Sequence, residues 1–124
     1  MSPDADRPSL RFPAARRLKH TREFARVRTE GRAVRGGLLL LGILEPGGEP
    51  AFRIGLVTSK RVGGAVVRNR VRRRLRAIVR KHQHALRPGL WLVIVARPPA
   101  GRATSAELEA EWLRLLERGR VVDA

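Results

Sequence analysis

The feature that most constrains this chain is the stretch from Arg53 to Lys81, which joins an apolar strand pattern to a strongly basic helix pattern. The strand pattern runs from Ile54 to Val57, and the helix pattern follows a Gly63-Gly64 break. From Ser59 to Lys81, ten residues are Lys or Arg and none is Asp or Glu. Like charges one turn apart destabilise a helix. The pattern therefore predicts that a polyanion lies against this helix.

The helix pattern has an apolar and a basic side. Apolar residues recur at helical spacing and form one stripe: Val67, Val71, Leu75, Ile78 and Val79. Polar and basic residues gather on the opposite face: Asn69, Arg72, Arg73, Arg76 and Arg80. Arg68 lies at one border of the stripe, with Arg70 and Arg74 towards the other. A merely solvated face would mix Glu with Lys, so we expect guanidinium groups here that bind phosphates.

Charge and length narrow the class of protein. The chain has 124 residues, a formal net charge of +16 and a pI near 12.0, which predicts one domain with a nucleic-acid or anionic-membrane partner. No apolar run reaches the roughly 18 residues of a membrane span. Leu38–Leu41 is too short for a signal-peptide core, so we expect a cytoplasmic protein. With no cysteine, disulfides and thiolate chemistry are excluded.

The chain divides into an arm and a folded part. Residues 1–16 contain three prolines among scattered charges, which predicts a flexible basic N-terminal arm that either adds an RNA contact or is simply a free terminus. A first helix is expected from Arg22 to Glu30, with Thr21 as N-cap and Gly31 at its end. Phe24 and Val27 share one face of it.

Three strands and two more helices complete the expected order. Residues 36–44 and 51–58 should pair as a hairpin around the turn at 45–50, and residues 90–96 form an apolar run typical of a buried strand. A last helix is expected from Ser105 to Arg118, with a capping box of Thr104 and Glu107. The order α-β-β-α-β-α over residues 17–124 predicts an α+β two-layer sandwich.

Catalysis by this chain alone is not expected. A two-metal nuclease needs clustered carboxylates, and there are none from Ala51 to Ala106. His82 and His84 are two apart on a helix and do not face each other. The Gly63-Gly64 pair lacks the Lys-Ser/Thr context of a phosphate-binding loop and is interpreted as a sharp turn into the helix.

The run SKRVGGAVVRNRVRRRLR, residues 59–76 with Arg68-Asn69-Arg70 at its centre, resembles the signature of the bacterial ribonuclease P protein subunit. Residues of the expected type stand at Ser59, Lys60, Arg61, Gly63, Ala65, Arg68, Asn69, Arg70, Arg72, Arg73 and Arg76. The resemblance extends more weakly to residues 17–24 and 93–100. It implies ferredoxin-like layers with a left-handed crossover and makes residues 17–124 an RNA-binding domain.

The resemblance also implies an activity and its partners. Ribonuclease P removes the 5′ leader of precursor tRNA as an endoribonuclease, with Mg²⁺ ions and the catalytic centre in its RNA subunit and no catalytic residue in the protein. The implied contacts to that RNA are Lys60, Arg61, Arg68, Asn69, Arg70, Arg72, Arg73 and Arg76. The implied leader-binding cleft contains Phe24, Arg28 and Arg53. No membrane and no obligate protein partner are expected.

The expected cleft departs from the family's usual pattern. Arg28 stands where the family often has a second aromatic, and residues 38–42 read LLLLG in place of an aromatic-rich strand. Arg28 would then stack on a base or hold a phosphate. Phe24 is either a core anchor or the cleft aromatic, and the sequence supports both interpretations.

Two other classes of protein remain open on charge alone. A ribosomal or other structural RNA-binding protein would also be strongly basic. An amphipathic helix on a membrane surface would carry bulky aromatics on its apolar face, whereas this stripe has only Val, Leu and Ile. Binding to double-stranded DNA is not excluded, but no helix-turn-helix spacing is evident.

Overall fold

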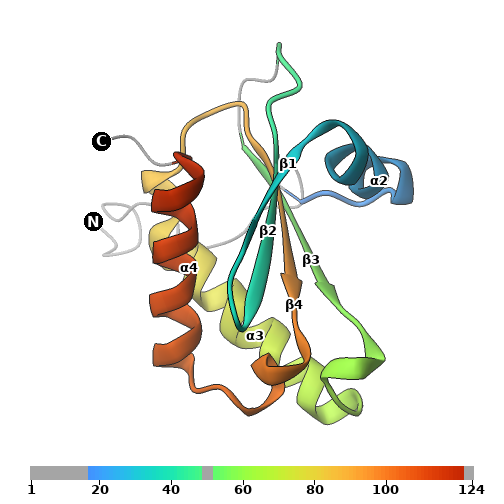
Figure 1. Cartoon of the computed structure of the whole chain (residues 1–124), viewed down its shortest axis with the longest axis vertical. Helices are drawn as coiled ribbons and strands as arrows, with labels where there is room; N and C mark the ends of the chain where they lie inside the picture. The colour runs from blue at the N-terminus through green and yellow to red at the C-terminus, as the bar shows by residue number, and fades with distance from the viewer. Residues whose placement is uncertain (1–16, 49–51, 122–124) are drawn as a thin grey trace, which may run out of the picture.

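The computed structural model of the chain describes residues 17–48 and 52–121. Figure 1 shows one twisted sheet with helices on both faces. The helices are α2 (Thr21–Glu30), α3 (Ala65–His82) and α4 (Ser105–Gly119), and the strands are β1 (Arg32–Arg35), β2 (Leu39–Leu44), β3 (Arg53–Thr58) and β4 (Trp91–Ala96). Short 3-10 turns are η2 (Lys60–Val62), η3 (Gln83–Ala85) and η4 (Pro98–Arg102). The expected N-terminal arm, residues 1–16, lies outside the described residues.

The α+β layering is confirmed, with one strand more than predicted. The sheet order is β1-β2-β4-β3, and β1 pairs antiparallel with β2. The predicted strand over residues 36–44 is in fact β2 preceded by a turn, and β1 lies before that turn. The sequence of β1, RAVR, is short, polar and mostly exposed, so it carries no alternation that would predict a strand.

The predicted hairpin between residues 36–44 and 51–58 is wrong. β4 lies between the two strands, antiparallel to β2 and parallel to β3. The reason is visible in β4 itself, because five of its six residues are buried. A strand that is apolar on both faces belongs in the middle of a sheet, where both faces are covered.

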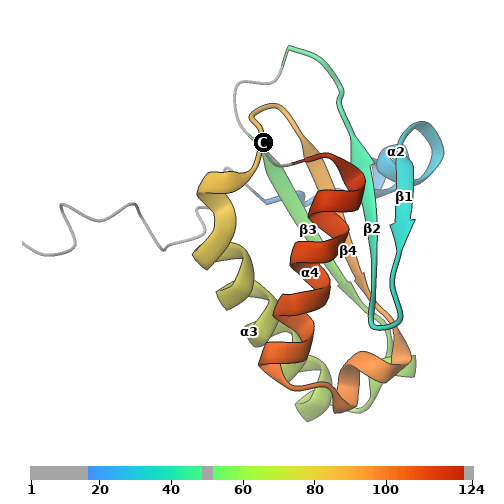
Figure 2. The same cartoon turned by 60° about the vertical axis from the view of Figure 1, so that its left-hand side comes forward.

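Alternate residues of β4 separate two cores. Leu92 and Ile94 belong to the larger core, which α3 and α4 cover. Trp91 and Val93 face the other way and pack with Leu18 and other residues around α2. Figure 2 shows α3 and α4 side by side over one face of the sheet. Among the described helices, α2 is therefore the one on the opposite face, and it covers only part of that face.

The amphipathic helix forms as predicted. Four of the five stripe residues of α3 are buried, namely Val71, Leu75, Ile78 and Val79, and Val67 is partly buried. The Gly63-Gly64 pair makes the expected turn into the helix. Gly63 has φ +154°, and a Cβ there would lie 2.8 Å from the side chain of Val67. The last helix also agrees, since Thr104 and Glu107 form the expected capping box.

The start of α2 differs from the prediction. Its N-cap is His20, and Thr21 lies in the first helical turn. The carboxylate of Glu23 accepts hydrogen bonds from the backbone N–H groups of Lys19 and His20, both at 3.0 Å. Glu23 also binds Arg53 of β3, with 2.6 Å between Oε2 and Nη1. Glu23, in the first turn of α2, thus links this helix to β3.

Stability is expected to depend on pH through Glu23. Burial raises its pKa, but the hydrogen bonds from His20 and Lys19 and the charge of Arg53 outweigh burial, so the pKa is lowered. A carboxyl group with a depressed pKa stabilises the fold above its unfolded value, about 4.3, and loses this effect as pH falls through the lower folded value. The cost of Glu23→Gln should therefore be largest near neutral pH and shrink below about pH 4.

Urea unfolding of the unchanged protein and of Glu23→Gln between pH 7 and pH 3 measures the difference in their free energies of unfolding. Glu30→Gln is the control, because it removes an exposed ion pair with Arg26 on the same helix and should change little at any pH. A cost of Glu23→Gln that stays constant across this pH range would contradict the stabilising effect that we ascribe to the lowered pKa of Glu23.

Candidate nucleic-acid interface

The outer face of α3 is basic and solvent-exposed. Asn69, Arg73 and Arg76 are exposed, and Arg72 is half-buried and donates to Asn69 Oδ1 at 3.1 Å. With Val66, which is 78% exposed, these residues line a shallow groove of about 460 Å³. Lys60 and Arg61 are exposed on η2, just before the helix. No acid stands on this face, so the electrostatic prediction for an anionic partner fits the geometry.

Two arginines at the border of the apolar stripe of α3 bind a neighbouring segment of the protein. Arg70 Nη2 donates to the carbonyl of Gly101 at 2.9 Å, and Arg74 Nη1 donates to the carbonyl of Ala103 at 2.6 Å. These contacts fix α3 to the segment between β4 and α4. Arg68 is half-buried on the other border. Of the eight predicted RNA contacts, Arg70 therefore also holds the fold together.

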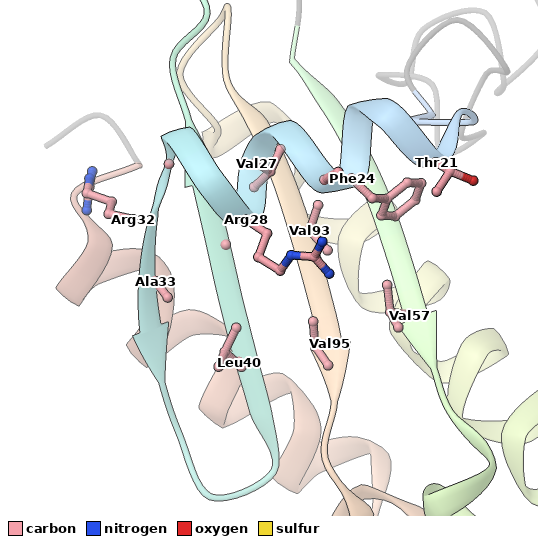
Figure 3. A pocket seen from close by; sticks show the side chains of 13 residues that line it. Thr21, Phe24, Val27, Arg28, Arg32, Ala33, Leu40, Val57, Val93 and Val95 are labelled. Atoms are coloured by element: carbon pink, nitrogen blue, oxygen red, sulfur yellow. The ribbon is translucent and has the colours of Figure 1, made fainter.

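A second feature is a cleft between α2 and the uncovered part of the sheet. It has a volume of about 480 Å³ and a largely apolar floor, which includes Leu40, Val57 and Val95 from three strands. Figure 3 shows Phe24 and Arg28 directed from α2 towards these strands. Both predicted cleft residues on α2 thus line the cleft, and it lies on the face of the sheet opposite α3.

Phe24 combines the two roles that the sequence left open. It is half-buried and packs against the smaller core, as an anchor would. Its ring lies directly over Gly55, where an added Cβ would come within 2.3 Å of the ring. It also lines the cleft. The glycine in β3 therefore makes room for a ring that stays partly exposed.

Arg53 does not line the cleft. Its guanidinium binds Glu23 and lies over the ring of Trp91, 5.3 Å from the centroid. Arg26 contacts the same ring at 5.5 Å. Arg53 therefore supports the base of α2. The sequence did not reveal that Arg53 would contact Glu23 and Trp91.

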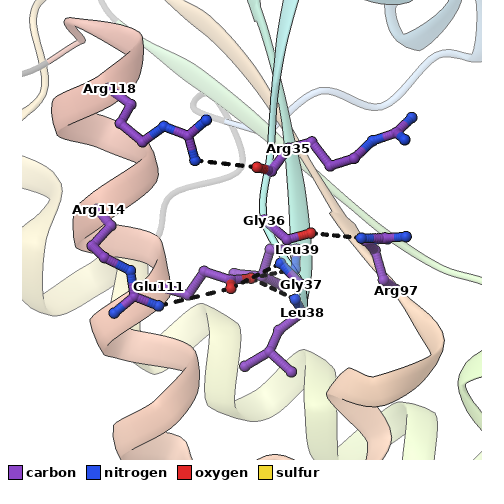
Figure 4. A network of polar contacts seen from close by, with 9 residues as sticks. All are labelled: Arg35, Gly36, Gly37, Leu38, Leu39, Arg97, Glu111, Arg114 and Arg118. Atoms are coloured by element: carbon purple, nitrogen blue, oxygen red, sulfur yellow. Dashed lines mark hydrogen bonds and ion pairs between the residues drawn. The ribbon is translucent and has the colours of Figure 1, made fainter.

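Glu111 is a residue whose role the sequence analysis missed. This side chain of α4 is buried, with 6% of its surface exposed. Its carboxylate accepts backbone N–H groups of the β1–β2 turn: Gly37 at 3.1 Å, Leu38 at 2.7 Å and Leu39 at 2.6 Å. Figure 4 shows this network together with Arg97, which donates to the Gly36 carbonyl at 2.7 Å.

The network positions one wall of the cleft. Among the described strands, β1 lies at the edge of the sheet and pairs with β2 alone. The turn between them also receives contacts from Glu111 of α4. Arg118 Nη1 adds a bond to the Arg35 carbonyl at 3.2 Å. Ala33 and Leu40 of this hairpin line the cleft. The contacts of α4 with the turn therefore help to position cleft residues on the opposite face of the sheet.

The described part of the chain has no cluster of metal ligands and no membrane-spanning helix, and its His82 contacts an acidic side chain. Among residues 17–48 and 52–121, no three His, Asp or Glu side chains gather where they could hold a metal ion. His82 Nε2 lies 2.7 Å from Glu109 Oε2, in a contact between α3 and α4. No helix in these same residues is long and apolar enough to cross a membrane.

The comparisons with known proteins agree with one another. A family model described as Ribonuclease P matches residues 12–120. The "Ribonuclease P protein component" of Beutenbergia cavernae is 49% identical over 101 residues, covering 81% of this chain and 84% of the relative. The protein of that name from Roseiflexus castenholzii is 41% identical over 109 residues, covering 87% and 88%.

Solved structures share the fold. The Staphylococcus aureus RNase P protein aligns with a TM-score of 0.81 at 24% identity, covering 87% of this chain and 98% of the other. The RNase P protein from Thermotoga maritima aligns with a TM-score of 0.73 at 24% identity, covering 82% and 96%.

Proposed function

From the premise that this chain belongs to the ribonuclease P protein family, we propose that it binds the catalytic RNA subunit with α3 and the 5′ leader of precursor tRNA in its cleft. As a family member it is the protein component of an endoribonuclease that acts in tRNA processing. The observation that carries the two-surface proposal is the placement of an acid-free basic helix on one face of the sheet and an apolar cleft on the other.

The RNA subunit is assigned to the α3 side. Lys60, Arg61, Asn69, Arg73 and Arg76 are exposed there and would contact its backbone, with Arg72 beside Asn69. Arg guanidinium groups grip phosphate oxygens in pairs, and each contact displaces counterions from the RNA. Arg68 and Arg70 contribute charge at the borders of this face, where Arg70 also bonds to Gly101.

The leader is assigned to the cleft. A single strand offers unpaired bases, which stack on aromatic rings and on guanidinium planes. Phe24 would provide the ring and Arg28 the cation, over a floor of aliphatic side chains. Because the floor has no aromatic residue, stacking is confined to α2, and the rest of the strand would meet apolar contacts that do not depend on base identity.

The protein's chemical contribution is positioning and charge neutralisation. Catalytic Mg²⁺ would supply nucleophile activation and charge stabilisation at the RNA subunit, because the described residues of this chain offer no carboxylate cluster to hold it. The cleft would orient the leader, and α3 would keep the protein on the RNA. We propose a cytoplasmic location for this activity because the chain belongs to a family that acts in tRNA processing.

The cleft is tested by Phe24→Ala. We expect affinity for precursor tRNA to fall by about 1–3 kcal/mol per stacked base, and only when the leader is present. Stability should fall by less than the roughly 3–5 kcal/mol typical of a fully buried Phe, because the ring is half-buried. The measurements are melting temperature and holoenzyme affinity for substrates with and without the leader.

Leu18→Ala is the matched control for this experiment. Leu18 is buried in the same small core but does not line the cleft. It should lower stability without a leader-dependent effect. Equal losses on both substrates for Phe24→Ala would return Phe24 to a purely structural role.

A further inference from the structure

A second basic groove lies at the end of the sheet, where η2 and η4 meet. Figure 1 shows these turns at the lower ends of β3 and β4. The groove has a volume of about 620 Å³. Its lining includes Arg61 from η2, Arg70 from α3, and Pro98, Pro99 and Arg102 from η4. Thus three arginines from segments up to 41 residues apart in the sequence surround one hollow.

The groove is formed before any partner binds. Gly101 packs so closely on η2 that a Cβ there would lie 2.4 Å from the Val62 carbonyl oxygen. The carbonyl of the same glycine accepts the hydrogen bond of Arg70 at 2.9 Å. η2, η4 and α3 are therefore held together at one point. A preformed site loses little conformational entropy on binding, which favours affinity.

None of the three arginines of the groove forms an ion pair with an acidic side chain among the described residues. Arg61 and Arg102 are exposed, and their side chains make no hydrogen bond or ion pair with the described part of the chain. Arg70 Nε is buried and has no hydrogen-bond acceptor among the described residues. None of the described lining residues is acidic. Three cations around one hollow repel one another unless an anion lies between them, and Arg is well suited to phosphate.

We propose that this groove binds the backbone of the RNA subunit, with Arg61 and Arg102 on phosphates and Pro98–Pro99 against a ribose or base. This rests on the function proposed above and extends the α3 surface to η4, a segment to which the motif assigns no contact. The RNA subunit is the favoured occupant because Arg61 and Arg70, which line the groove, are among the residues implied to contact that RNA. The groove shares no lining residue with the leader cleft.

The test measures affinity of the full chain for the ribonuclease P RNA transcript over a salt series. Arg61→Ala and Arg102→Ala should each weaken binding about tenfold, as expected for a lost charged hydrogen bond. Together they should flatten the slope of log K against log[salt] by about 1.4, at roughly 0.7 per contact for single strands. Arg114→Ala removes the same charge from the exposed outer side of α4 and is the matched control.

The outcomes separate this inference from the proposed function. If Arg102→Ala weakens binding no more than Arg114→Ala, while Arg72→Ala with Arg76→Ala weakens it strongly, the groove inference fails and the α3 assignment stands. If neither Arg102→Ala nor the double change Arg72→Ala with Arg76→Ala weakens binding, the groove inference and the α3 assignment both fail. A loss by Arg102→Ala seen only in holoenzyme assays on precursor tRNA that carries a leader would overturn the RNA-subunit assignment and give the groove to the leader.

Discussion

Replacing Glu111 with Ala is expected to lower the free energy of unfolding by about 2–5 kcal/mol, because a buried donor without an acceptor costs about 1–3 kcal/mol. The backbone N–H groups of Leu38 and Leu39 would both lose their acceptor, and the third donor, Gly37, is exposed and can bond to water. The measurement is urea unfolding at neutral pH.

Two further variants make the Glu111 prediction specific. Glu111→Gln keeps one carbonyl oxygen but places an amide N–H₂ against backbone donors, so its cost should be intermediate. Glu117→Ala removes an exposed carboxylate from the same helix and should cost little. A Glu111→Ala protein as stable as the Glu117→Ala protein would show that the β1–β2 turn does not depend on the carboxylate.

Replacing Arg72 and Arg76 together with Ala is expected to flatten the salt dependence of RNA-subunit binding by roughly one to one and a half units, at about 0.7 per phosphate contact. Both residues stand on the acid-free face of α3, and neither holds another element of the fold. The fold should therefore remain intact, which circular dichroism can check. The measurement is binding of the RNA subunit across a salt series.

The control for this pair removes the same charge elsewhere. Arg22 and Arg114 are exposed on α2 and α4, and neither lines the α3 groove. Their double Ala variant should change the slope much less. An unchanged slope for Arg72→Ala with Arg76→Ala would remove this face of α3 from the interface.

The basic helix was predictable because its information is local. A stripe of apolar residues at helical spacing fixes which side is buried, so the opposite, exposed face follows from geometry alone. The motif extended this local prediction to function. The same holds for β4, whose continuous apolar run required a position covered on both faces.

Two errors are local, namely the N-cap of α2 and the missed short strand β1, and the others concern pairs that are distant in sequence. The hairpin prediction assumed that neighbouring strands pair, whereas β4, about 50 residues after β2, takes the central place. The resemblance placed Arg53 in the cleft, and nothing in the sequence indicated its contact with Glu23, which is 30 residues away. Local periodicity cannot report such contacts.

The position of Glu111 in the sequence could have indicated its role. It lies three residues after Leu108 and four before Leu115, and therefore on the buried stripe of α4. A carboxylate on a buried stripe needs hydrogen-bond donors. The Gly36-Gly37 pair marks a turn with exposed backbone, and its pairing with Glu111 required the three-dimensional structure.

The most direct test of the central claim is cleavage of precursor tRNA by the purified chain, with and without its cognate RNA subunit, at low Mg²⁺ concentration. We expect no cleavage by the protein alone. The RNA subunit alone should be weakly active under these conditions, and the two together should cleave efficiently at the mature 5′ end. Specific cleavage at that position by protein free of RNA would contradict the account, as would a protein that leaves the activity of the RNA subunit unchanged.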